Sequence, residues 1–117
     1  MSKTFSTDHI ARILETAAVR LQHGYSRVGV RAAERDEILD LALKAVDEVE
    51  GKMMALRGGY LGTGNEATGS AMAYLCVAER AGYGVEDAGM CGTTARVQAE
   101  TMSAAMLSAA NVLRTLA

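Results

Sequence analysis

Apolar residues separated by three or four positions dominate this sequence, and the spacing narrows the possible folds more than any other property. Side chains at these intervals lie on one face of an α-helix. Residues 10–21, 38–56 and 95–116 each carry such a stripe. In the last segment the apolar positions are Ala95, Ala99, Met102, Met106, Ala109, Leu113 and Leu116, separated alternately by four and three residues. A chain with these stripes folds by burying helix faces against one another.

A fourth segment differs because it is apolar on every side. Residues 71–78 contain no polar side chain apart from the hydroxyl of Tyr74 and the thiol of Cys76. A helix of this kind is typically surrounded by protein, so we expect the third helix to be the central one and Cys76 to be buried, reduced and inert. The sequence contains no proline, and residues that favour strands are few. The fold class predicted is all-α, a four-helix bundle forming one helical domain over residues 1–117.

Glycines separate the helical segments. We expect Gly24 to end a first helix that begins near Ser6 or Thr7, and residues 58–64 to end a second that begins near Arg31. The third helix is predicted from Asn65 to about Ala81, with residues 82–84 as its end. The fourth is predicted from Thr93 or Thr94 to the end of the chain.

No catalytic, cofactor-binding or metal-binding residue is predicted. The histidines, His9 and His23, lie at opposite ends of one helix and cannot share an ion. The cysteines, Cys76 and Cys91, form no C-x-x-C pair. The acidic residues of the second helix are interleaved with basic ones, which is typical of a solvated helix face.

The longest apolar run is eight residues, far below the roughly 20 needed to cross a membrane. We therefore expect no membrane partner and a cytoplasmic location. The net charge of −2 gives no electrostatic reason to expect nucleic acid.

Two groups of residues are candidates for contact with a partner protein. Arg27, Arg31 and Arg35 are spaced by four and would line one helix face. Tyr60 and Leu61 lie in a glycine-rich connection, where an exposed tyrosine is a reasonable contact residue.

The final helix is the main indication of function. Between Val97 and Leu113 it carries one charge, Glu100, whereas a solvated helix normally carries more. We therefore expect it to be covered by a second copy of the chain in a homodimer. The predicted interface residues are Met102, Met106, Leu107, Val112 and Leu113.

These observations favour a non-catalytic protein–protein interaction module. Its narrower form is a small inhibitor or adaptor that blocks a larger complex, a type to which the anti-CRISPR proteins of phages and mobile elements belong; only size and the lack of catalytic motifs suggest it. Two alternatives stay open. One is a nucleic-acid-associated regulator that uses the three arginines. The other is a small all-α nucleotide hydrolase in which acids of the second helix hold Mg²⁺.

Overall fold

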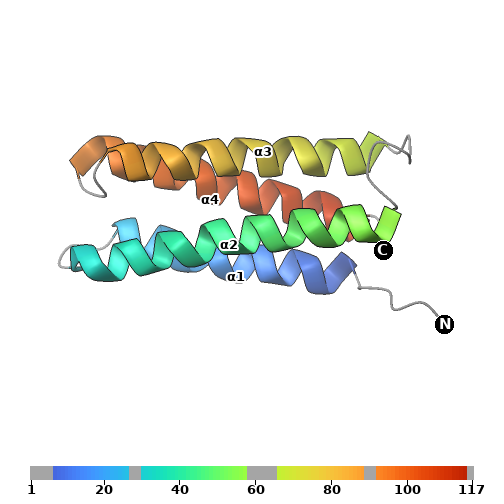
Figure 1. Ribbon diagram of the computed structural model, residues 1–117, viewed down its shortest axis with the longest axis horizontal. Coiled ribbons are helices and arrows are strands. Elements are labelled where there is room, and N and C mark those ends of the chain that lie inside the picture. Colours follow the sequence, from blue (N-terminus) through green and yellow to red (C-terminus); the bar gives the residue numbers. More distant parts are fainter. Residues whose placement is uncertain (1–6, 27–29, 58–65, 89–91, 116–117) are drawn as a thin grey trace.

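The computed structural model describes residues 7–26, 30–57, 66–88 and 92–115, and over these ranges the fold is all-α. Four helices follow one another: α1 (Thr7–Ser26), α2 (Ala32–Arg57), α3 (Glu66–Asp87) and α4 (Gly92–Thr115). Figure 1 shows them running up and down in turn as a four-helix bundle, which confirms the predicted fold class.

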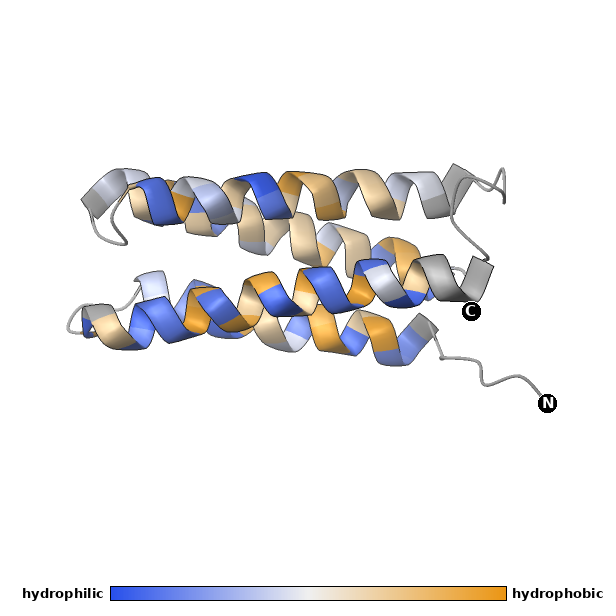
Figure 2. Ribbon diagram, in the orientation of Figure 1, coloured by the Kyte–Doolittle hydropathy of each residue, from blue (hydrophilic) through white to orange (hydrophobic). Residues whose placement is uncertain are grey.

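Each helix contacts its two neighbours in the bundle, but not equally. The α3–α4 and α1–α4 pairs contact each other extensively, the α1–α2 pair less so, and α2 and α3 only sparingly. The core contains the stripes that the spacing predicted, such as Ile10, Leu14 and Leu21 of α1, all fully buried. Figure 2 shows apolar and polar positions alternating along α1 and α2, as expected of helices with one buried face.

The expectation that the third helix is covered on all sides is wrong. Tyr74 and Val77 of α3 are 41% and 47% exposed, and Cys76 between them is exposed and free. The helix with the most cover is α4, which lies between α1 and α3. An unbroken run of small and apolar residues therefore did not signal burial, because α3 packs extensively against α4 and only sparingly against α2, which leaves its outer face exposed.

The third helix also continues beyond its predicted end. It passes through Gly82 and Gly84 and reaches Asp87. A Cβ atom on Gly82 would lie 2.6 Å from Leu43 Cδ2 and 3.1 Å from Met102 Sδ. The missing side chain lets α2 and α4 approach α3 here, so this glycine serves packing rather than helix termination.

The same reason explains Gly24, which lies inside α1 rather than at its end. A Cβ atom there would lie 2.7 Å from Ile38 Cδ1 of α2. Gly24 thus brings the end of α1 against the start of α2.

Polar contacts join α1 to α4 at two levels. The buried Ser103 hydroxyl donates a hydrogen bond to the carbonyl of Ala18 at 2.9 Å. Near the start of α1, Arg114 of α4 donates two hydrogen bonds to Glu15, one of them at 2.9 Å, and a third to Asp8 at 3.1 Å. A bidentate arginine–carboxylate pair fixes orientation as well as distance, so it sets the register of α4 on α1.

Candidate functional site

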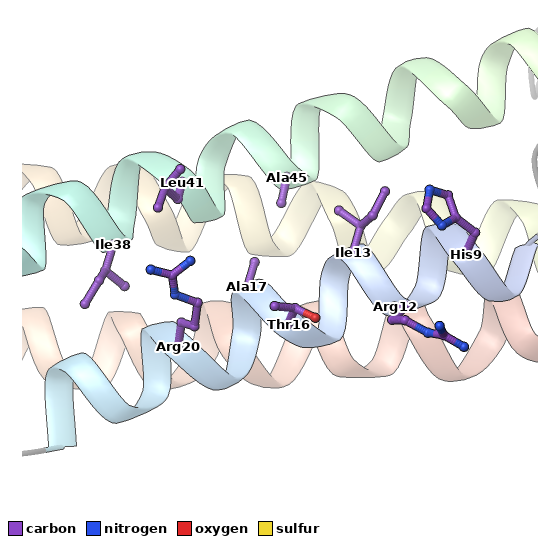
Figure 3. Close-up of a pocket in the computed structure, with 9 residues that line it drawn as sticks. All are labelled: His9, Arg12, Ile13, Thr16, Ala17, Arg20, Ile38, Leu41 and Ala45. Carbon is purple, nitrogen blue, oxygen red and sulfur yellow. The ribbon is translucent and has the colours of Figure 1, made fainter.

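A groove with a volume of about 360 Å³ lies between α1 and α2 on the described surface. Figure 3 shows the two helices lining it along their length. Its lining residues are His9, Arg12, Ile13, Thr16, Ala17, Arg20, Ile38, Leu41 and Ala45. We call this feature the α1–α2 groove.

The floor of the groove is apolar because the edges of two helix stripes meet there. Ile13 and Ala17 of α1 are half-buried and pack against the core, as does Ile38 of α2. Leu41 lies farther out, and 39% of it is exposed. An exposed leucine is ordinary by itself, but one that joins several half-buried apolar neighbours extends a continuous apolar surface.

Basic side chains line the α1 side of this floor. Arg12 forms an ion pair with Asp8 at 3.2 Å, and Figure 3 shows it pointing away from α2. Arg20 instead extends toward α2, between Ile38 and Leu41 (Figure 3). Within the described ranges no carboxylate lies within ion-pair distance of Arg20. Glu34 lines a neighbouring hollow together with Arg20 but is paired with Arg31 at 3.3 Å.

A second cluster consists of acids on the facing sides of α2 and α3. Asp47, Glu50 and Glu79 each offer a carboxylate oxygen, and these oxygens all lie within 4.8 Å of one another. Burial raises the pKa of Glu50 above its usual value, and the nearby charges of Glu79 and Asp47 raise it further. The first effect arises because the fold removes water from the carboxylate, and the second because it brings like charges together.

This acidic cluster places one acid of α3 against two of α2, whereas the hydrolase alternative requires a second acidic pair that faces the first from another helix. Asp47 is exposed and the other two acids are half-buried. Clusters of exposed carboxylates are common without a metal, so the nucleotide hydrolase stays a prediction. Nucleoside triphosphate turnover that requires Mg²⁺ and is lost in Glu50→Gln would support it.

The arginine stripe is only partly available as a contact surface. Arg31 is exposed and paired with Glu34. Arg35 donates a hydrogen bond to the carbonyl of Gly24 at 3.0 Å, and its guanidinium lies 5.5 Å from the centre of the Tyr25 ring. Arg35 therefore helps to join the ends of α1 and α2. Arg27, Tyr60 and Leu61 lie outside the described residues, so these contact predictions and the nucleic-acid alternative remain predictions.

Burial of Tyr25 completes this junction. Its hydroxyl donates a hydrogen bond to the carbonyl of Arg35 at 3.4 Å. Burial raises the pKa of Tyr25 to about 12, so the hydroxyl keeps the proton that it donates.

The residues predicted for an oligomer interface on α4 lie inside the bundle of a single chain or pack against its core. Met102, Met106 and Leu113 are buried inside the bundle, and Leu107 and Val112 are half-buried and pack against the core. The apolar stripe of α4 from Ala95 to Leu113, which we call the seam, is present, but α1 and α3 of the same chain cover it. A surface that is already covered within one chain cannot also contact a second copy.

Sequence reasoning missed the α1–α2 groove because it assigned the floor residues to the core. Leu41 was the available signal: it lies three residues after Ile38 and four before Ala45, so it widens their stripe toward the charged face of the helix. An apolar stripe that is wider than one packing partner can cover leaves apolar surface exposed at its edge.

Within the described ranges, no helix is long and apolar enough to cross a membrane. Comparison with protein-family models, with curated proteins and with solved structures finds no match to this chain.

Proposed function

We propose that this chain is a non-catalytic protein-binding module whose docking surface is the α1–α2 groove. One observation supports the proposal above others: the exposed Leu41 continues the apolar floor formed by Ile13 and Ile38 across two helices. The transfer of apolar surface out of water is favourable, so a partner that covers the groove gains free energy of association. The narrower form of the proposal is a small inhibitor or adaptor that occludes a larger complex. Such a protein needs a docking surface and no catalytic group.

A binding surface of this shape suits an α-helix of the partner. The lining residues of α1 run from His9 to Arg20, which is about 17 Å along the helix axis at 1.5 Å per residue. Grooves between two helices commonly accept the apolar face of a third, with anchors at intervals of three, four and seven residues.

Differential capture tests the proposal. Leu41→Asp places a charge in the groove, and Tyr83→Asp is the matched control because Tyr83 is 52% exposed on α3. In lysate of the organism that produces the protein, we expect wild type and Tyr83→Asp to retain the same partner, and Leu41→Asp to lose it. Thermal melting of all three proteins confirms that they are folded. Equal retention by both variants would contradict the proposed surface, and so would the absence of any specifically retained protein.

A homodimer remains a proposal, but it requires a surface other than the seam of α4. The described large apolar side chains exposed on α3 and α4 are Tyr74, Val77, Tyr83 and Val97, and we take Tyr74, Val77 and Val97 as the candidate surface. Light scattering of wild type and Val77→Asp tests this surface: a dimer that Val77→Asp dissociates supports it, and a wild-type monomer at high concentration contradicts it.

A further inference from the structure

The charges around the α1–α2 groove are not balanced. The described residues that line it include the basic His9, Arg12 and Arg20 and no acid, and on α2 Asp40 pairs with Lys44 at 3.1 Å and Glu48 with Lys52 at 3.6 Å. On α1, Arg12 pairs with Asp8. Arg20 has no such partner in the described part of the chain, although it lines the groove.

Arg20 lies where a partner bound in the groove would meet its charge. It reaches across the groove beside Ile38 and Leu41 and is exposed to solvent (Figure 3). A guanidinium holds its charge at every physiological pH and pairs with a carboxylate through two parallel hydrogen bonds. A partner that covers Leu41 would also remove water from Arg20, and a carboxylate on that partner would replace the lost hydration.

We infer that the occupant of the α1–α2 groove is an amphipathic helix of another protein, with an acidic residue beside its apolar stripe that pairs with Arg20. This inference rests on the proposed function and specifies its partner. The apolar stripe of the partner helix covers Ile13, Ile38 and Leu41. The acidic residue follows the stripe at the end of the groove where Arg20 lies.

A second copy of this chain does not supply such a helix. Each described helix already buries its apolar stripe in its own bundle, as Leu14 of α1, Val46 of α2, Leu75 of α3 and Met106 of α4 show. To enter the groove of another copy, one of these helices would have to leave its core. The apolar side chains that stay exposed on α3, Tyr74 and Val77, are followed at the same three-residue spacing by Arg80, a basic residue that would repel Arg20, so the occupant belongs to a different protein.

Selection from a library of helical peptides of about four turns tests the inference without knowledge of the partner. The peptides carry leucines at positions i, i+4 and i+7, and the positions flanking this stripe are randomised between Glu, Lys and Ala. Selection is performed on wild type, Arg20→Glu and Leu41→Asp. Tyr83→Asp serves as the control, since Tyr83 is exposed on α3.

We expect wild type and Tyr83→Asp to enrich Glu at one flanking position, and Arg20→Glu to enrich Lys there. A selected Glu peptide should bind Arg20→Glu roughly tenfold more weakly than wild type, with the difference shrinking at high salt. Leu41→Asp should enrich nothing.

The outcomes separate this inference from the proposed function. If peptides are enriched without any preference for Glu or Lys, and Leu41→Asp abolishes this enrichment, the inference of an acidic partner helix is wrong. The groove would then remain the proposed docking surface. Enrichment of Lys by wild type also overturns the inference of an acidic partner helix. Peptides retained equally by wild type and Leu41→Asp, or by neither, count against both proposals.

Discussion

At the scale of single residues, two carboxylates respond to pH in opposite directions. Arg114 donates hydrogen bonds to Glu15 and holds its pKa below the ordinary value of 4.5. As the pH falls, the folded state therefore binds fewer protons than the unfolded chain. The stability that this pair contributes is fully present above pH 4.5 and is lost as the pH falls through the lowered pKa.

We expect Glu15→Gln to destabilise the protein at neutral pH by at most about 1 kcal/mol, because the pair is partly solvated. The difference from wild type should shrink as the pH falls below 4.5, because the unfolded wild-type chain then takes up a proton that folded Glu15 binds only at lower pH. Urea denaturation at several pH values measures both effects. A constant difference between the two proteins at every pH would show that Arg114 does not act through the charge of Glu15.

Glu50 shows the opposite sign, because its pKa is raised by burial and by its acidic neighbours. The folded state holds this proton more tightly than the unfolded chain, so stability falls as the pH rises from 4.5 through the raised pKa. Glu50→Gln should therefore stabilise the protein at neutral pH by roughly a few tenths of a kcal/mol, with the gain vanishing in acid. A loss of stability at neutral pH would contradict the repulsion with Asp47 and Glu79.

At the scale of helices, the glycines show what spacing predicts and what it does not. The apolar stripes of α1, α2 and α4 were predictable because helical periodicity is a local property of the sequence. Gly24 and Gly82 were misinterpreted as helix ends because their role depends on Ile38 and Leu43, residues of another helix. A glycine that terminates a helix and one that allows close approach look alike in the sequence.

Substitution of three glycines distinguishes these roles. Gly51 and Gly69 lie inside helices with no atom within 4 Å of an added Cβ, so Gly51→Ala and Gly69→Ala should each stabilise the protein by about 0.5–1 kcal/mol. Gly82→Val should destabilise it by about 1–3 kcal/mol, because Leu43 and Met102 occupy the space. Chemical denaturation measures all three. A stabilising Gly82→Val would show that α3 does not pack closely at this point.

At the scale of the whole molecule, the sequence predicts how many helices form but only partly how they cover one another. The bundle follows from four helical segments whose apolar stripes must be buried. Which helix lies between which neighbours is decided by packing, and the charge-poor α4 is covered by α1 and α3. The α1–α2 groove was beyond prediction for the same reason: Ile13 and Ile38 lie on the stripes of two different helices, and the packing of these helices against each other decides that Leu41 stays exposed.

The position of α4 leads to a prediction about how stability depends on protein concentration. If the seam is buried within one chain, unfolding of the seam involves no dissociation, and the denaturation midpoint does not depend on concentration. Met106→Ala removes a fully buried side chain and should cost about 2–5 kcal/mol, equally at low and high protein concentration. Because Val77 is exposed on α3, Val77→Ala is the control and should change stability little.

A dimer built on the seam behaves differently. Its midpoint rises with protein concentration, and Met106→Ala reduces that dependence by weakening the contact between copies. A dimer built on the face that contains Tyr74 and Val77 also gives a concentration-dependent midpoint, but Val77→Asp rather than Met106→Ala removes the dependence. Denaturation of the wild type and these variants over a hundredfold range of concentration, roughly a 2.7 kcal/mol change in the driving force for association, therefore identifies which surface, if either, joins two copies.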